Sequence, residues 1–254
     1  MADTATPGST SREVSDKGWL VLKQFIIDNK IKAGLWFTRL LTMIFTISYI
    51  IPIFGNVYNI YYKVLISHAA TSALRLHQRL PNVQFSREFL GMLLLEDSCH
   101  YLFYSIIFLY VPPVAIVLIP IFLFAMLHFF SFSLALLDCL GHNSWWGMRL
   151  LISLVEFQSY RILRFCALSE IIILPFTVLL VFTGRVGLLT PIMYYQFLKL
   201  RLASQRNSFT RNMFHEIRSL LSAVSKKPAM PDILRKMIEG FLSLTQQMAP
   251  VPRP

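Results

Sequence analysis

The sequence predicts an all-α multipass membrane protein, with helical hairpins that supply up to six membrane arms and with cytosolic amphipathic helices beside them. Three long apolar blocks carry this prediction: residues 33–74, 89–137 and 167–198. Stretches of about 18 or more largely apolar residues indicate membrane helices. Charged residues make up only 15% of the chain and the mean hydropathy is +0.56, whereas a soluble domain carries about a quarter charged residues.

The distribution of positive charge predicts the topology. Of the 24 Lys and Arg residues, 21 lie outside the three blocks, and cationic loops tend to stay in the cytosol. Each block is interrupted near its middle by Pro or Gly, so each can enter the membrane, turn and return. We therefore expect three hairpins with both chain termini in the cytosol. The predicted domains are a polar N-terminal tail (1–30), a membrane domain (31–202) and a basic cytosolic tail (203–254).

The first block predicts one clear span and one ambiguous arm. We expect residues 1–16 to be disordered and 17–30 to form either a short interfacial helix or a solvated lead-in. Residues 33–51 read as a spanning helix. The return arm, 58–74, is more polar. It is either a buried bundle helix or an amphipathic helix at the membrane surface. Pro81 is expected to end it.

The second block is long enough for two spans of about 20 residues each. Pro112 and Pro113 predict its turn, and Pro120 predicts a kink in its second arm. The segment 141–164, with Trp145 and Trp146, predicts a short interfacial helix. The third block is too short for two full crossings. Its second arm is therefore short, re-entrant, or extended by snorkelling of Lys199 and Arg201. Short arms that occupy mainly one leaflet would act as wedges.

The sharpest polar cluster within an apolar block contains Glu96, Asp97 and His100. Glu96 and His100 are four residues apart, on one face of a continuous helix, which could support metal binding or acid–base chemistry. We favour a structural ion-pair network, because ionisable groups in a membrane are costly unless paired. Glu170 is similar, with Arg161 and Arg164 as nearby cations. Glu96, Asp97 or both are expected to meet Arg75, Arg79 or His77 from the preceding helix.

The C-terminal tail carries two apolar stripes at helical spacing, and eight Lys or Arg residues against three acids. Basic amphipathic helices beside a membrane are typical of surface binding to anionic lipid. Alternatively, they pack on each other or on the cytosolic helices. The candidate membrane- or partner-binding residues are Phe209, Arg211, Arg218, Lys226, Lys227, Arg235, Lys236 and Phe241.

Other function classes have little support in the sequence. The net charge of +11 would suit nucleic acid, but the basic residues border membrane segments, which explains them without a nucleic-acid partner. No GxSxG, P-loop, GxGxxG or CxxC pattern is present. We therefore expect no enzyme activity, catalytic residue, metal or cofactor. The alternative is a lipid scramblase, transporter or channel modulator that uses Glu96, Asp97 and His100.

Three strings of the sequence are distinctive: TSALRLHQRLP at 71–81, LLEDSCHYL at 94–102, and YYQFLKLR at 194–201 with Arg206 and Asn207 following. They resemble the transmembrane protein 33 family, called Krüppel homologue 2 in insects and related to a yeast pore-membrane nucleoporin. The resemblance covers most of the chain from about residue 31 to 249. It implies a non-catalytic protein of the endoplasmic reticulum and nuclear envelope. It also implies roles in tubular membrane organisation, the response to unfolded proteins and nuclear-pore assembly, with reticulon-type proteins and nuclear-pore or import factors as partners. Members of the family are drawn with three or four spans.

Overall fold

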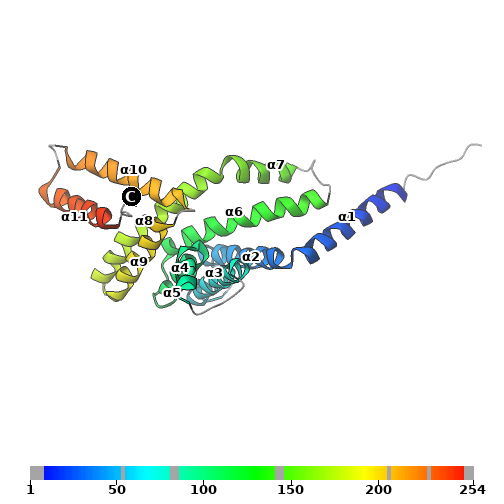
Figure 1. Ribbon diagram of the computed structural model, residues 1–254, viewed down its shortest axis with the longest axis horizontal. Helices are drawn as coiled ribbons and strands as arrows, with labels where there is room; N and C mark the ends of the chain where they lie inside the picture. Colours follow the sequence, from blue (N-terminus) through cyan, green and yellow to red (C-terminus); the bar gives the residue numbers. More distant parts are fainter. Residues whose placement is uncertain are drawn as a thin grey trace, which may run out of the picture.

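The computed structural model describes residues 9–52, 55–80, 86–140, 146–204, 207–227 and 230–248. Within these ranges the regular structure is helical throughout (Figure 1), as the predicted fold class requires. The expectations for residues 1–8, Pro81, Trp145 and Pro228 lie outside the described residues. The helices are α1 (Ser9–Asp28), α2 (Lys30–Ile50), α3 (Val57–Arg79), α4 (Arg87–Leu95), α5 (Asp97–Leu109), α6 (Ala115–Cys139), α7 (Trp146–Ile152), α8 (Ser159–Phe182), α9 (Leu189–Ala203), α10 (Ser208–Ser225) and α11 (Asp232–Met248), with a π-helical segment (Ser153–Phe157) before α8.

The N-terminal segment is more ordered than the sequence suggested. Residues 9–16 belong to α1, so the expected disorder is wrong there, and the lead-in to the first span is helical. The helix extends away from the body of the molecule (Figure 1). Near its end Phe25 stacks on Phe132 of α6, with ring centroids 6.1 Å apart. Trp19 and Leu20 stay exposed, which leaves α1 an apolar surface of the kind found on interfacial helices.

Helices α2 and α3 form the first hairpin. Gly55 in the turn has φ +82, a backbone conformation that glycine adopts without strain, and the side chain of Asn56 caps α3. Across the hairpin the Ser67 hydroxyl donates to the Thr38 carbonyl (2.9 Å). Because α3 buries its polar face against neighbouring helices, the return arm is a buried bundle helix and not a surface helix.

The first arm of the second hairpin is broken. Helices α4 and α5 meet at Glu96 with a bend of 80°. The expectation of a continuous helix through Glu96 and His100 is therefore wrong. The side chain of Ser86 caps α4, and Asp97 opens α5, where a negative charge suits the helix dipole. After the turn at 110–114, α6 contains Pro120 and is tied to α5 by the Tyr104 hydroxyl, which donates to the Val117 carbonyl (2.7 Å).

Helices α8 and α9 form the third hairpin. Helix α8 begins at Ser159, before the apolar block that predicted it, and has 24 residues. Gly184 in the turn has φ +68, again a conformation suited to glycine. Helix α9 has only 15 residues, about 22 Å at 1.5 Å per residue. The second arm is therefore short, as one of the expected alternatives required.

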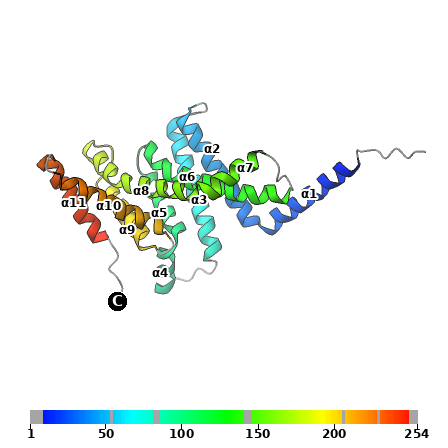
Figure 2. The ribbon, with the colours of Figure 1, turned by 90° about the horizontal axis from the view of Figure 1, so that it is seen from above.

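The turns of all three hairpins lie at the same end of the bundle. Helices α3 and α5 are antiparallel, since Arg79 meets Glu96 and His68 meets Ser105. Helices α5 and α9 are antiparallel as well, because the ring of Phe108 packs near Tyr194 while the start of α5 meets the end of α9. Figure 2 shows the turns of the first and third hairpins at one edge, with α4 at the opposite edge. We call the end away from the turns the base.

By length and composition, three of the described helices can cross a membrane: α2, α6 and α8. The bent pair α4 and α5 would add a fourth if it counts as one span. Of the six possible arms, α3 is too polar and α9 too short to meet the same test. The resulting count of three or four equals the number that the family resemblance implied.

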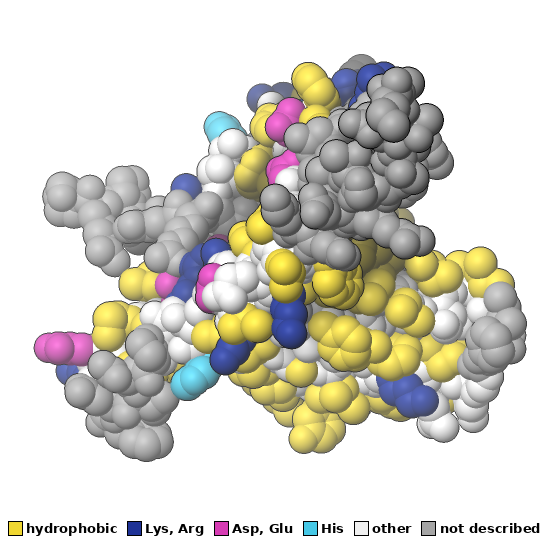
Figure 3. All heavy atoms as spheres, turned by 90° about the vertical axis from the view of Figure 1, so that its right-hand side faces the viewer, with side chains coloured by type: hydrophobic (Ala, Val, Ile, Leu, Met, Phe, Trp, Pro, Cys, Tyr) yellow, Lys and Arg dark blue, Asp and Glu magenta, His cyan; other side chains and the backbone are white. Residues whose placement is uncertain are grey.

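The interior and the surface differ from those of a soluble bundle. An aromatic cluster fills the centre, where α3, α5 and α9 meet, and its members are almost fully buried: Tyr61, Tyr101, Tyr104, Phe108, Tyr194 and Phe197. Large apolar side chains are also exposed, including Phe37, Ile44 and Ile47 on α2. Figure 3 shows hydrophobic side chains over a broad part of one face. Apolar surface on this scale is expected where lipid, and not water, is the solvent.

Candidate functional site

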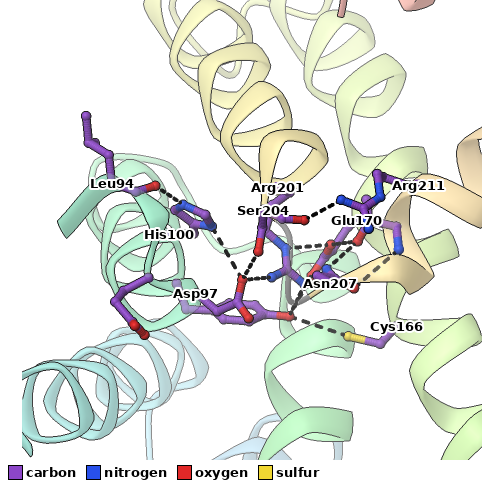
Figure 4. A network of polar contacts seen from close by, with 12 residues as sticks. Leu94, Asp97, His100, Cys166, Glu170, Arg201, Ser204, Asn207 and Arg211 are labelled. Atoms are coloured by element: carbon purple, nitrogen blue, oxygen red, sulfur yellow. Dashed lines mark hydrogen bonds and ion pairs between the residues drawn. The ribbon is translucent and has the colours of Figure 1, made fainter. Parts of the chain in front are cut away.

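A fully buried carboxylate, that of Glu170 on α8, is paired with Arg201 on α9 (Figure 4). The residues are 0% and 3% exposed. Oε1 accepts from Arg201 Nη2 (3.1 Å) and from the Tyr101 hydroxyl (2.5 Å), and Oε2 accepts from Arg201 Nε (3.2 Å) and the Thr210 hydroxyl (3.3 Å). Both carboxylate oxygens are thus satisfied, as a buried charge requires.

Arg201 also reaches a second carboxylate. Its Nη1 donates to Asp97 Oδ1 at 3.2 Å, and the Ser204 hydroxyl donates to the same oxygen at 2.8 Å. The guanidinium carbon lies 4.8 Å from the ring centroid of Tyr101, a cation–π arrangement. A planar guanidinium with five donors can bridge two acids in this way, whereas a lysine ammonium could not match the geometry. Arg201 therefore joins α5, α8 and α9 at the base of the bundle.

The tail begins inside this network. Asn207 caps α10 and donates from Nδ2 to the Thr210 hydroxyl (2.6 Å). Arg211 donates to the Ser204 carbonyl (2.8 Å), which lies at the end of α9. Figure 4 shows these groups converging from the end of α9 and the first turns of α10. The start of the tail is thus fixed to the membrane helices through side-chain contacts, although sequence analysis placed a domain boundary at 203.

Two further groups border the network. His100 Nε2 lies 2.7 Å from the Leu94 carbonyl, so Nε2 carries the proton, and its Nδ1 is 3.8 Å from Asp97. The buried thiol of Cys166 donates to the Pro120 carbonyl at 3.8 Å. Within the described residues, no group of three or more His, Cys, Asp or Glu side chains could hold a metal ion. The arrangement is suited to locking helices together.

The expected ion-pair partners are only partly correct. Arg79 Nη1 does meet Glu96 Oε2, at 2.7 Å. Asp97, however, pairs with Arg201 from a distant part of the chain. Arg75 instead lies 3.4 Å from His128 of α6, and the side chain of His77 is exposed. Of the expected alternatives, the Glu96–Arg79 pair is the one that forms. Asp97 forms its ion pair with Arg201 of α9, although it also lines a cavity together with Arg75 and Arg79 of α3.

The expected compensation of Glu170 is wrong as well. Arg164 pairs with Glu216 of α10, and Arg161 is exposed. The true partner, Arg201, was assigned to snorkelling, although it is nearly fully buried. The sequence does contain an indication that Arg201 is buried. Arg201 follows Tyr194 and Phe197 at helical spacing, on the face of α9 that bears the buried aromatic rings.

The candidate tail residues separate into buried and exposed groups. Phe209 packs edge-on against Tyr160, with centroids 5.7 Å apart, and Phe241 packs partly buried against the core. These two aromatics face protein, as the packing alternative anticipated. Arg218 is half-buried, and Arg235 pairs with Asp232 at 3.5 Å. The exposed cations are Lys226, Lys227 and Lys236.

Comparisons with known proteins agree with the resemblance seen in the sequence. The profile of the family described as Transmembrane protein 33/Nucleoporin POM33 matches residues 15–251. Krueppel homolog 2 of Drosophila melanogaster is 46% identical over 233 residues, which cover 92% of this chain and 84% of the relative. Human Transmembrane protein 33 is 39% identical over 229 residues, covering 89% and 93%. The Transmembrane protein 33 homolog of Caenorhabditis elegans is 36% identical over 236 residues, covering 90% and 85%. No solved structure matches. The chain therefore belongs to the Transmembrane protein 33/Nucleoporin POM33 family.

Proposed function

We propose that this protein is a non-enzymatic organiser of tubular membrane in the endoplasmic reticulum and nuclear envelope. The observation that carries the proposal is the set of three hairpins whose turns lie at one end of the bundle, with basic connectors at the other. The word nucleoporin in the family description supports a place at the nuclear envelope. Reticulon-type proteins and nuclear-pore or import factors are the partner classes that we include in the proposal.

The short arm α9 supplies a physical route to membrane bending. Helix α9 has 15 residues, about 22 Å of helix against a hydrocarbon core of about 30 Å. If the base lies on the cytosolic side, this arm adds more volume to the cytosolic leaflet than to the opposite one. Such an imbalance favours positive curvature.

The topology can be tested by glycosylation. Acceptor sequences inserted at Gly55, Pro113 and Gly187 should be modified in microsomes, provided that linkers carry them clear of the membrane, because all three turns would face the lumen. Acceptors inserted in the basic connectors 75–88 and 138–166 serve as controls and should remain unmodified. Efficient modification of either connector would contradict the arrangement and remove the basis of the wedge.

The tail offers a surface suited to the membrane. Helices α10 and α11 expose Leu220, Ile233 and Met237. Between these helices and the third hairpin runs an apolar groove of about 920 Å³, lined from one side by Phe182 and Leu179. Lipid chains would fill this groove if α11 lies along the bilayer. Apolar burial combined with nearby lysines is the usual basis of interfacial binding.

The exposed lysines of the tail predict a salt-dependent contribution to lipid binding. Reversing Lys226 and Lys227 to Glu should weaken binding of the full chain to vesicles that contain phosphatidylserine, since each cation near an anionic surface contributes about 1 kcal/mol. Proteoliposome tethering to anionic vesicles at low and high salt would measure it. The variant Lys63→Glu on α3 is the matched control. Equal tethering by the tail variant and the wild type at low salt would exclude an electrostatic contribution.

Shape change is the direct test of the proposal. Full-length protein reconstituted into liposomes at rising protein-to-lipid ratio should convert large vesicles into tubules or small vesicles, as judged by electron microscopy. A variant with α9 lengthened by apolar residues on the turn side should bend membrane less, because its arm would reach both leaflets. Unchanged vesicle shape at high protein density would overturn the proposal.

A second candidate function, lipid handling by a scramblase or transporter, is favoured by one observation. Asp97 and Tyr101 line a polar cavity between the first and second hairpins. Glu170 and Arg201, by contrast, form a pair that is 0% and 3% exposed, which favours a structural role for that part of the network. A lipid-scrambling assay on the same proteoliposomes would distinguish this function from shape change alone.

A further inference from the structure

A polar cavity of about 60 Å³ lies between α2, α3, α5 and α6, next to the buried network, with which it shares Asp97 and Tyr101. Its volume is several times the roughly 15 Å³ that one water needs. Three arginines contribute to its wall: Arg39, Arg75 and Arg79. The remaining lining residues are Thr42, His68, Thr71, Ser72, Asp97, Ser98, Tyr101, Phe124, Ala125 and His128.

Within the described residues, neither Arg39 nor Arg75 forms an ion pair with a carboxylate, although Asp97 and Glu96 attract Arg75 from a greater distance. Arg39 and Arg75 repel each other, and the one side-chain hydrogen bond of Arg75 runs to His128. The nearby acids are engaged elsewhere: Glu96 binds Arg79, and Asp97 binds Arg201. Unpaired guanidinium groups in an apolar bundle carry a large desolvation cost. An anion in the cavity would offset that cost.

The charge balance indicates the kind of anion. Among the described residues, the cavity and the adjoining network together hold five arginines, at 39, 75, 79, 201 and 211, against Glu96, Asp97 and Glu170. With neutral histidines the sum is two positive charges. One phosphate monoester, whose second pKa is about 6 and which is therefore largely a dianion at neutral pH, would neutralise them. Guanidinium groups with neighbouring hydroxyls, here Ser72 and Ser98, form the donor set that suits phosphate oxygens.

We propose that this cavity binds one phosphate-ester anion, held chiefly by Arg39 and Arg75. The cavity lies toward the base of the bundle, where α3 ends and α5 begins. The basic connectors occupy the same end, and lipid headgroups would lie there. A phospholipid headgroup and a soluble phosphate ester share the chemistry, so the test must separate them. The site does not depend on whether the hairpins bend membrane.

The test uses the full chain, purified in a neutral detergent and depleted of bound lipid. Native mass spectrometry would follow binding of dioctanoyl phosphatidic acid, with dioctanoylglycerol as the phosphate-free comparison. We expect one tightly bound phosphatidic acid and no comparable binding of dioctanoylglycerol. Competition by glycerol phosphate would assign the site to soluble phosphate esters. Binding of the lipid without such competition would assign it to a headgroup. Equal binding of the two lipids in wild type would overturn the proposal without any variant.

The variants Arg39→Met and Arg75→Met locate the site. Each should weaken binding of phosphatidic acid by about tenfold or more, the usual loss when one partner of a buried charge contact is removed. Arg185→Met, at the exposed turn of the third hairpin, removes a cation of the same type and should bind as wild type does. Equal affinity in all three variants would contradict the assignment. If a Met variant fails to purify, Arg39→Lys and Arg75→Lys keep the charge and test the need for the guanidinium group.

Discussion

Replacing Arg201 by Ala is expected to destabilise the protein by about 3–5 kcal/mol, the range found when one partner of a buried ion pair is removed. The reason is that two carboxylates lose their shared cation at once. Glu170 is fully buried and would keep only the hydroxyl donors Tyr101 and Thr210. Denaturant unfolding of the purified protein in detergent would measure the loss, and steady-state abundance in cells should fall with it.

Two comparisons make the Arg201 result specific to the buried pair. Arg164→Ala removes a partner of Glu216, but both side chains are about half exposed, at 41% and 47%, so a loss of about 0–1 kcal/mol is expected. The double variant Arg201→Met with Glu170→Gln should be more stable than Arg201→Met alone, because the stranded charge is gone. Equal losses of stability in Arg201→Ala and Arg164→Ala would show that burial does not determine how much an ion pair contributes to the free energy of unfolding.

The hairpins could be predicted because their signals are local. Apolar runs, the breaks at Pro112 and Gly184, and the placement of Lys and Arg all lie within short stretches of sequence. Each break became a turn in the structure. The length of α9 followed from the length of its block. The local sequence and the thickness of the bilayer determine these features, and both are known before the fold is known.

The pairing of charges could not be predicted in the same way. Asp97 and Arg201 are 104 residues apart, and Glu170 and Arg201 are 31 apart. Sequence proximity favoured Arg161 and Arg164 as partners of Glu170, and that expectation failed. It correctly placed Arg79 among the candidate partners of Glu96. The 80° bend at Glu96 decided the outcome, yet neither Pro nor Gly marks it. The bend follows from tertiary contacts, since it carries Asp97 to Arg201 and leaves Glu96 with Arg79.

The aromatic centre should matter as much as the ion pair, and Tyr104 is its most constrained member. The residue is fully buried. Its ring centroid lies 4.9 Å from that of Phe108 and 5.2 Å from that of Phe197, and its hydroxyl donates to the Val117 carbonyl across the second hairpin.

Tyr104→Ala should cost about 3–5 kcal/mol of stability, because the cavity left by the ring adds to the lost contacts. Tyr104→Phe keeps the ring and should cost about 0.5–1.5 kcal/mol, the contribution of one hydrogen bond. Tyr110→Ala, at a residue 88% exposed, is the matched control and should stay within about 0.5 kcal/mol. Unfolding in detergent would measure all three. If Tyr104→Ala were no worse than Tyr110→Ala, the helices would be held together mainly by lipid and by their polar contacts, and the close packing of α5 with α9 would not be what sets the hairpins in register.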